Sequence, residues 1–222
     1  MAHDDRRSFL TKLGAGVTVA GTTLAAGGSL AQAQPARSTA FQPTRHPQDD
    51  WLDALPGGHR FVFDTTTLTG IENALLYANN FYVASQSGYS LGNADAAVVI
   101  VVRHISTAFG FNDAMWKKYS EPLAKLTGAV DRKTQQPAAV NIYLTGGDTA
   151  MASLAGRGVQ FAVCQMATRR FAGQIAQASG GTADAVYTEL TSNLVPNSHM
   201  VAAGILAVNR AQERGYTLAI TL

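Results

Sequence analysis

The feature that most constrains the fold is the segment AAVVIVVRH at residues 96–104. Its first seven residues are apolar, and five of them are β-branched. A strand that is apolar at consecutive positions, rather than at alternate ones, is buried on both faces. Such strands occur almost only in parallel sheets that carry helices on both sides. The segment therefore predicts the central strand of an α/β domain.

Strand and helix patterns alternate along the rest of the chain. Strands are expected at residues 59–64, 96–104, 139–144, 159–164, 193–196 and 216–222. Helices are expected at residues 67–85, 112–126, 147–158, 165–189 and 198–215. Pro122 is expected to break the second of these helices, and Asp148 to cap the third. The alternation predicts a three-layer α/β domain with a mostly parallel sheet of about five strands.

The first 33 residues have the features of an export signal. Arg6 and Arg7 are followed by a Phe-Leu pair and then by a run of Gly, Ala, Thr and Val. The run ends in Ala-Gln-Ala at 31–33, where small residues indicate a cleavage site. The paired arginines indicate the twin-arginine route. Residues 1–33 are therefore expected to be a twin-arginine signal peptide, and the mature protein to be periplasmic or secreted.

A polar segment follows at residues 34–58, rich in Pro, Gln, Asp and Gly. This composition predicts a flexible arm ahead of a single domain at 59–222. Trp51, Leu52 and Leu55 give the arm an apolar side. These side chains are expected to pack either on the domain or on a neighbouring subunit.

The charge of the chain argues against some partners. The sequence has 17 basic and 15 acidic residues, of which the leader holds three and two, leaving 14 and 13 and a net charge of +1. A near-neutral chain with no basic cluster is not expected to bind nucleic acid. No segment beyond the leader is long and apolar enough to span a bilayer, so no membrane association is expected after cleavage.

The chain has one cysteine, Cys164, at the end of a predicted strand. A single cysteine excludes an intrachain disulfide, a CxxC redox pair, a CxxCH haem attachment and a cysteine-rich zinc site. Three alternatives remain: a reactive thiol, an inert core residue, or a disulfide to another chain. The GxGxxG, Walker and GxSxG patterns are absent from the sequence, and no cofactor is expected.

Ligands of parallel α/β sheets bind beyond the carboxyl ends of the strands. This rule selects candidate site residues without any motif. The segments at that edge are 64–67, 103–104, 145–147, 164–165 and 197–199. Cys164 and His104 are therefore predicted to lie where such domains do their chemistry.

Three segments of the chain resemble the DsrE/DsrF-like family. They are VVIVVRHISTAFGFNDAMWKKY, LAGRGVQFAVCQMAT and LVPNSHMVAAGILAVNRAQERGYTLAI, which together span most of residues 59–222. With its leader, the chain is similar to the exported, twin-arginine branch of that family. The resemblance implies a flavodoxin-like α/β fold and a homo-oligomer, which is a dimer, a trimer or a hexamer.

The resemblance also implies a function. Well-studied members of the family pass sulfur between proteins as a cysteine persulfide, and Cys164 matches their strand-end cysteine. Arg103, His104, Asn112 and Asp113 match a recurrent segment of the exported branch. The chain is thus expected to be a sulfur carrier that exchanges sulfur with a partner protein or with a small sulfur anion. The alternative is a non-catalytic oligomeric module that binds a small anion and buries its cysteine.

A sulfur carrier needs a thiolate that positive surroundings stabilise. The helix predicted after Cys164 offers its N-terminal partial positive charge, and Arg169 and Arg170 follow within two turns. These arginines lie near the positive end of the helix dipole, where cations are mildly unfavourable. Such a local conflict often marks a functional site.

The other candidate residues each have a structural alternative. His104 is expected either to shuttle a proton or hold an anion, or to bond to a loop carbonyl. Arg103 is expected to bind an anionic ligand or to pair with Asp113. The predicted ligand-binding set is completed by four further residues: Asn112, Asp113, Arg169 and His199. His199 lies near a predicted helix start that capping alone would explain.

Two further sites are suggested by looser patterns. A metal site built from His104, His199 and Cys164 has no characteristic spacing, and no metal is expected. The hydroxyl-rich turn DTTTLTG at 64–70 resembles the turns that hold phosphates or flavin-type ligands in flavodoxin-like domains. Ordinary capping of the following helix explains the same threonines.

Overall fold

The computed structural model of the protein describes residues 42–222, so the predicted leader and the start of the arm lie outside the described residues. The elements, in chain order, are η1 (Pro47–Asp49), α1 (Asp50–Ala54), β1 (His59–Thr65), α2 (Leu68–Tyr89), η2 (Asn93–Asp95), β2 (Ala96–Val102), η3 (His104–Gly110), α3 (Asp113–Lys118), α4 (Ser120–Thr127), α5 (Met151–Gly156), β3 (Gln160–Cys164), α6 (Gln165–Ser179), α7 (Ala183–Thr191), β4 (Ser198–Val201), α8 (Gly204–Gln212) and β5 (Thr217–Thr221).

The five strands form one parallel sheet in the order β4-β3-β2-β1-β5. The central strand is β2, and all seven of its residues are buried. Val98 and Ile100 face one hydrophobic core, and Val99 and Val101 face the other. This two-sided burial confirms the prediction made from the β-branched run, and the sheet confirms the three-layer, flavodoxin-like α/β class.

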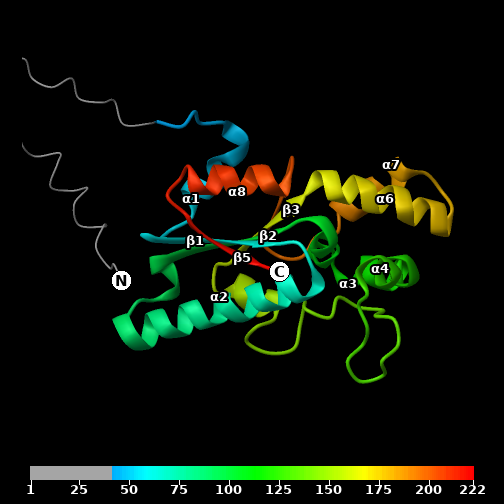
Figure 1. Ribbon diagram of the computed structural model, residues 1–222, viewed down its shortest axis with the longest axis horizontal. Coiled ribbons are helices and arrows are strands. Elements are labelled where there is room, and N and C mark those ends of the chain that lie inside the picture. The colour runs from blue at the N-terminus through cyan, green and yellow to red at the C-terminus, as the bar shows by residue number, and fades with distance from the viewer. Residues whose placement is uncertain (1–41) are drawn as a thin grey trace, which may run out of the picture. The chain divides into compact units, whose positions relative to one another are not determined.

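The strand order determines which helices cover which face. From β1 to β4 each strand is added on the same side of the previous one, so right-handed crossovers place their helices on one face of the sheet. The return from β4 to β5 runs the other way and places α8 on the opposite face. Figure 1 shows this arrangement, with α1 and α8 on one side of the strands and α2 on the other.

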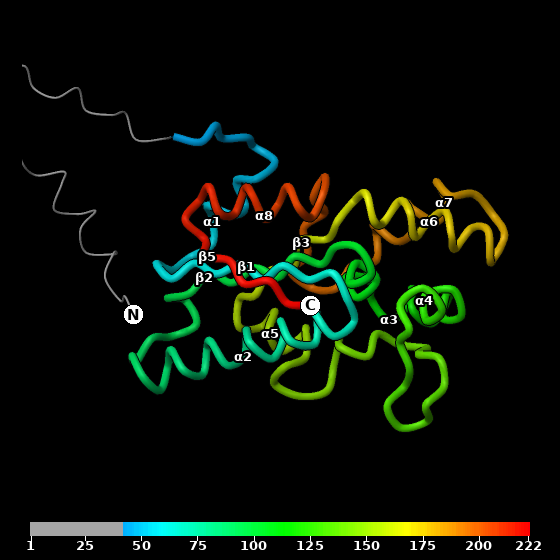
Figure 2. Tube along the Cα trace, viewed as in Figure 1, coloured from blue at the N-terminus to red at the C-terminus, as the bar shows by residue number. Residues whose placement is uncertain are grey.

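The order in which strands are added to the sheet reverses after β4, and this reversal separates the connections that follow β3 and β4. The connection that leaves β3 enters α6, whose buried side chains join the same core as those of α2. The connection that leaves the neighbouring β4 enters α8, whose buried side chains join the opposite core. Figure 2 traces the chain through both connections. Adjacent strands whose outgoing connections diverge leave a crevice at the carboxyl edge, the usual ligand site of open α/β sheets. The fold therefore predicts a cavity beyond the ends of β3 and β4.

The described part of the arm packs on the domain rather than standing away from it. Residues 43–222 form one compact unit. Leu52 is buried beneath α8, and its carbonyl accepts hydrogen bonds from Tyr216 Oη at 2.8 Å and Arg60 Nη1 at 3.0 Å. The buried Arg214 donates to Asp53 at 2.9 Å. Of the two alternatives for the apolar side of the arm, the structure shows contact with its own domain.

The strand predicted at residues 139–144 is wrong. These residues form turns in which Asn141 and Tyr143 are buried, whereas Ala139 and Val140 are exposed. Asn141 Nδ2 donates to the carbonyls of Phe109 and Phe111 at 2.8 and 2.9 Å. The segment satisfies loop carbonyls in place of a sheet ladder, because both sides of β3 are already paired with β2 and β4.

The boundary between β4 and α8 also differs from the prediction. Residues 198–201 were expected to begin a helix, but they pair with β3 as an edge strand, and the helix begins only at Gly204. The apolar run from Met200 to Val208 is continuous in the sequence and hides this boundary. The strand expected at 193–196 is reduced to one isolated bridge between Leu194 and Phe111.

Two helix predictions can be compared directly with the structure. The helix expected at 112–126 is broken, as predicted, into α3 and α4, and Pro122 lies in the first turn of α4, where no intrahelical N–H bond is lost. The cap predicted at Asp148 is wrong, because α5 begins at Met151 after Ala150 and has no side-chain cap.

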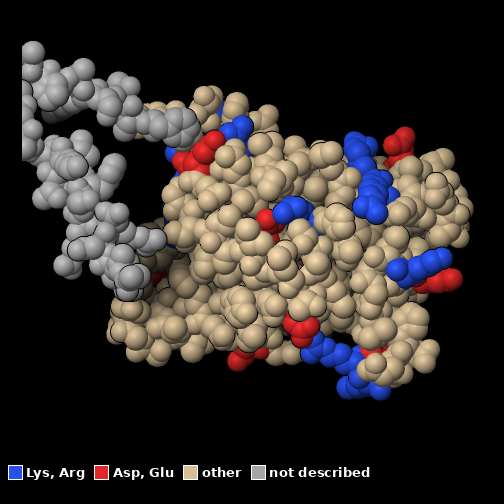
Figure 3. All heavy atoms as spheres, viewed as in Figure 1, with Lys and Arg blue, Asp and Glu red and all other residues tan. Residues whose placement is uncertain are grey.

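Two surface properties of the described residues bear on the predictions about charge and membranes. No helix within residues 42–222 has the length and apolar character needed to cross a membrane. On the face drawn in Figure 3, basic and acidic side chains lie in small separate groups among uncharged residues, without an extended surface of one sign.

Candidate functional site

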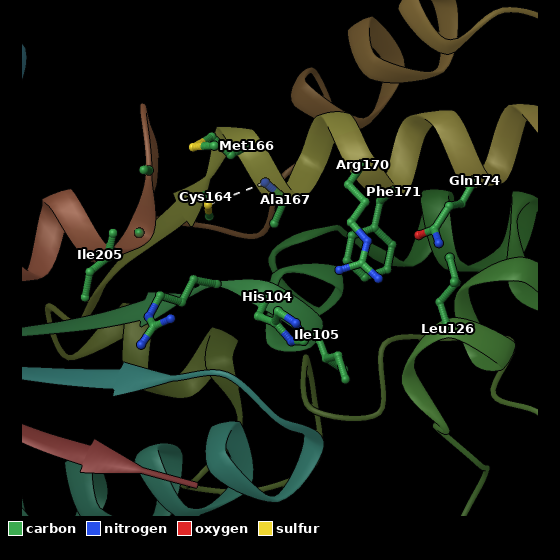
Figure 4. A pocket seen from close by; sticks show the side chains of 13 residues that line it. His104, Ile105, Leu126, Cys164, Met166, Ala167, Arg170, Phe171, Gln174 and Ile205 are labelled. Carbon is green, nitrogen blue, oxygen red and sulfur yellow. Dashed lines mark hydrogen bonds between the residues drawn. The ribbon is translucent and has the colours of Figure 1, made fainter.

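A cavity of about 330 Å³ opens at the carboxyl edge of the sheet, where the diverging connections predict one. Its wall combines a thiol, cationic groups and many apolar side chains from η3, α4, α6 and α8 (Figure 4). The polar members are Arg103, His104, Cys164, Arg170 and Gln174. The apolar members include Ile105, Leu126, Met166, Ala167, Phe171 and Ile205.

Cys164 joins β3 to α6 and lies in the wall of this cavity. It is the N-cap residue of α6, and its Sγ accepts a hydrogen bond from the N–H of Ala167 at 3.5 Å. Thr168 Oγ1 donates to the Cys164 carbonyl at 2.9 Å and holds the turn. Only 6% of Cys164 is exposed. The thiol therefore lies at a helix N-terminus, which favours an anion there, and a ligand reaches it through the cavity rather than from open surface.

Arg103 approaches the cavity as half of a bidentate ion pair. Its Nε and Nη2 atoms donate to the two carboxylate oxygens of Asp64 at 2.6 and 2.8 Å. The pKa of Arg103 is raised, first by this hydrogen bond and, to a smaller extent, by the negative charge of Asp64. The predicted pairing with Asp113 is wrong, because the buried Asp64 at the end of β1 takes that role.

The start of α8 lies directly against Arg103. A Cβ atom added to Gly204 would stand 2.5 Å from Arg103 Cβ and 3.0 Å from Arg103 Cδ. Only glycine leaves room for the aliphatic part of the arginine at this point. The close approach brings the two sides of the crevice, η3 and α8, together below the cavity.

His104 opens η3 at the edge of the cavity, and its ring is exposed. Its backbone has φ of 57°, in the left-handed region that is unfavourable for residues other than glycine. The turn is held by Ser106, whose Oγ accepts from the N–H of Arg103 at 3.0 Å. Strain of this kind concentrates at functional sites, and here it keeps the imidazole at the cavity.

The two neighbouring arginines of α6 have different surroundings. Arg169 stacks on Tyr187, with its guanidinium carbon 4.1 Å from the ring centre, and does not line the cavity. Arg170 does line it, and its side chain extends from α6 alongside Phe171 (Figure 4). The sequence analysis placed both arginines near Cys164 but included only Arg169 in the ligand-binding set, whereas the structure places Arg170 at the cavity. Helical spacing could have identified Arg170 from the sequence, because residues 167, 170, 171 and 174 share one face of a helix.

Asn112 and Asp113 lie away from the cavity and support the chain locally. Asn112 is the N-cap of α3 and accepts from the N–H groups of Ala114 and Met115 at 3.0 and 3.3 Å. Asp113 Oδ1 accepts from the N–H of Asn141 at 2.9 Å. Neither residue lines the cavity with Arg103.

His199 lies in β4 and is separate from the cavity. Its ring stacks on Trp51 with a centroid distance of 4.0 Å, and its Nε2 lies 3.0 Å from Gln160 Oε1. Burial lowers the pKa of His199. His199 therefore does not lie in one site with Cys164 and His104, as a metal site built from the three would need. No group of three metal-ligating side chains is found in the described part of the chain.

The hydroxyl-rich turn after β1 makes its hydrogen bonds within the fold. Thr67 Oγ1 caps α2 by accepting from the N–H of Gly70 at 2.8 Å. Thr65 is buried and donates to the Val101 carbonyl at 2.9 Å. A Cβ added to Gly70 would meet the Thr221 carbonyl oxygen at 2.5 Å. The capping alternative therefore explains Thr67, and a contact with the neighbouring strand explains Thr65.

The site and the fold together define a class: a parallel α/β domain with one thiol at a helix N-terminus, inside a cavity that has cationic groups in its wall. A comparison with protein-family models found no match, and comparisons with curated proteins and with solved structures found none either. The resemblance to the DsrE/DsrF-like family stays a prediction, and the function is argued from the geometry.

Proposed function

We propose that this chain is an exported DsrE-like sulfur carrier in which Cys164 accepts a sulfane sulfur and holds it as a persulfide. The observation that carries the proposal is the position of its sulfur. Cys164 Sγ caps α6 and lines a cavity with Arg103, His104 and Arg170 in its wall. A helix N-terminus and the cationic groups in the wall favour an anion at this position, and the nucleophile in sulfur exchange is the anionic thiolate.

The transfer step balances without any cofactor. With thiosulfate as donor, the Cys164 thiolate attacks the outer sulfur and forms a new S–S bond. The original S–S bond breaks, and its electron pair leaves with sulfite. The products are a Cys164 persulfide anion and sulfite, and the reverse kind of attack by an acceptor thiolate removes the sulfur. We also propose that the chain forms a homo-oligomer and that it exchanges this sulfur with a donor or acceptor protein.

Arg103 and His104 have distinct roles in this step. Arg103 is held by Asp64, so it is a fixed donor that positions an anion at the cavity rather than a mobile charge. His104 is exposed and has its own backbone turn, so its imidazole can bind the departing anion or give it a proton. Neither residue forms the new bond.

The experiment is incubation of the reduced protein with thiosulfate or polysulfide, followed by intact mass measurement. We expect a mass gain of one sulfur atom, reversed by a reducing agent. Cys164→Ser is the matched control, because the chain then has no thiol. No adduct on the wild type, or the same adduct on Cys164→Ser, would refute the proposal.

A second candidate is a non-catalytic oligomeric module that binds a small anion. The observation in its favour is that Cys164 is only 6% exposed. This candidate expects a thiol that resists small alkylating reagents in the native state and reacts only after unfolding. Rapid labelling of the native protein, at a rate near that of a free thiol, would exclude it.

A further inference from the structure

The cavity is larger than an inorganic sulfur anion needs. At roughly 30 Å³ for each water-sized group, its volume of about 330 Å³ holds about ten non-hydrogen atoms. Thiosulfate would fill only about half of this space. The volume lies within the range of small-molecule sites, at its lower end.

Most of the wall beyond the thiol is apolar. Ile105, Leu126, Phe171 and Ile205 come from four different elements and line the same cavity as Cys164. Figure 4 shows Ile205 on one side of Cys164 and the other three on the opposite side. Ile205 is 60% exposed and Met166 is 69% exposed, so apolar side chains also stand at the opening. An inorganic anion gains nothing from such a wall, whereas a hydrocarbon or aromatic group buries its surface there.

The charges at the wall have one sign. No Asp or Glu lines the cavity, and the nearby Asp64 is used by Arg103. Arg170 has no ion pair with any residue between 42 and 222. Arg170 is exposed, so its guanidinium is free to pair with an anionic group on the ligand.

We propose that the cavity binds an organic anion with a compact apolar body of about ten non-hydrogen atoms. The anionic end faces Arg170 and Cys164, and the apolar body lies along Phe171, Leu126 and Ile105. That this anion is a sulfur donor rests on the proposed function, whereas its charge and apolar body rest on the wall alone. The donor class that fits is an organic thiosulfonate, which carries an outer sulfane sulfur on a sulfonyl group.

Sulfur transfer from an organic thiosulfonate to Cys164 needs no added oxidant or reductant. The Cys164 thiolate attacks the outer sulfur, a new S–S bond forms, and the bond to the sulfonyl sulfur breaks. The electron pair leaves with the organic sulfinate, and Cys164 keeps the sulfur as a persulfide anion.

Binding is tested without transfer by using alkanesulfonates of increasing length, from methanesulfonate to octanesulfonate, with Cys164→Ser protein in a calorimeter. We expect affinity to rise about fourfold for each buried methylene until the cavity is full, because burial of a CH₂ group contributes about 0.8 kcal/mol. Alcohols of equal length, which lack the charge, should bind more weakly. Affinity that does not depend on chain length would overturn the proposal.

The neighbouring arginines provide a matched pair for the charge. Arg170→Gln should weaken octanesulfonate binding by about tenfold, the usual effect of losing one charged hydrogen bond. Arg169→Gln removes the same charge one residue away, from a side chain that stacks on Tyr187, and should leave binding unchanged. Equal effects of the two substitutions would show general electrostatics and would overturn the proposed position of the anion.

Transfer is then measured on the wild type with methanethiosulfonate and benzenethiosulfonate, each rate being divided by the rate with free cysteine. We expect the aromatic donor to be preferred by about tenfold after this correction. Equal corrected rates together with no sulfonate binding would overturn this inference and leave the proposed function standing. Sulfonate binding with no sulfur adduct from any donor would support the cavity ligand and refute the proposed function.

Discussion

The two ends of the sheet's carboxyl edge differ in how the chain leaves them. After β1 the chain enters α2 at once, and Gly70 packs against the Thr221 carbonyl of β5. After β3 and β4 the chain diverges to opposite faces, and a cavity of about 330 Å³ remains. We call the first end the closed half and the second the open half.

The position of the cavity in this fold depends on the connections between strands and helices. The closed half has the richer polar sequence, with three consecutive threonines after Asp64, but a strand contact uses the hydroxyl of Thr65 and helix capping uses that of Thr67. The open half reads as an ordinary apolar strand followed by a helix. Divergent connections, rather than polar residues, leave space for a ligand.

The largest effect is expected from Arg103→Leu in the open half. It leaves the Asp64 carboxylate buried and without its partner, and breaking a buried pair in this way costs about 3–5 kcal/mol. The free energy of unfolding in urea, measured at neutral pH, should fall by this amount.

The control for this substitution is the double variant Asp64→Leu with Arg103→Leu. Replacing both partners by apolar residues removes the unpaired charge, so most of the lost stability should return. A double variant as unstable as Arg103→Leu would show that Arg103 acts through packing on Gly204 rather than through its charge.

A smaller loss is expected from Gly70→Ala in the closed half. The new Cβ would stand 2.5 Å from a backbone carbonyl oxygen of β5, which cannot move without disturbing the sheet. Overpacking of this kind costs about 1–3 kcal/mol. Gly88→Ala in the same helix has nothing within 4 Å and should be neutral or stabilising by about 0.5–1 kcal/mol. Equal effects of the two changes would show that the closed half has room to spare.

The parts of the fold that follow from local pattern could be predicted from the sequence. The run at 96–102 is apolar at every position, so its burial on both faces was predictable without tertiary information. The segment at 139–144 has an equally good strand pattern, yet it forms turns because no strand edge is free beside β3. Pairing depends on the whole sheet, and local pattern does not contain it.

The candidate site was predictable to a similar degree. Cys164, Arg103 and His104 were found from the rule of carboxyl ends, and all three line the cavity. Arg170 was left out of the ligand-binding set because the choice between two adjacent arginines depends on the helical face, and Arg169 turns to Tyr187 on α7. Leu126 and Ile205 belong to elements far away in the sequence, and only the fold brings them to Cys164.

The stability of the protein should depend on pH through His199, which lies in β4, the edge strand of the open half. Burial lowers the pKa of His199 in the folded protein, whereas an unfolded histidine has a pKa of about 6.5. As the pH falls below that value, the unfolded chain binds the proton first, so stability decreases until the folded pKa is reached and then levels off. His199→Phe keeps a ring beside Trp51 and should remove this decrease. The decrease is measured as the shift of the urea midpoint between pH 8 and 5. Identical pH profiles for the wild type and His199→Phe would contradict the prediction.

The smallest expected effects compare the helix caps of the two halves. Thr67 caps α2 with an oxygen at 2.8 Å from the Gly70 nitrogen, whereas Cys164 caps α6 with a sulfur at 3.5 Å from the Ala167 nitrogen. Sulfur is a weak acceptor, and serine is among the best N-cap residues. Thr67→Ala should therefore lose about 1 kcal/mol of unfolding free energy, whereas Cys164→Ser should keep its stability or gain up to about 1 kcal/mol. A gain on Cys164→Ser, together with loss of the sulfur adduct, would mean that the open half keeps a weaker cap for its chemistry. A loss of more than about 1 kcal/mol would instead assign Cys164 to core packing and favour the binding module.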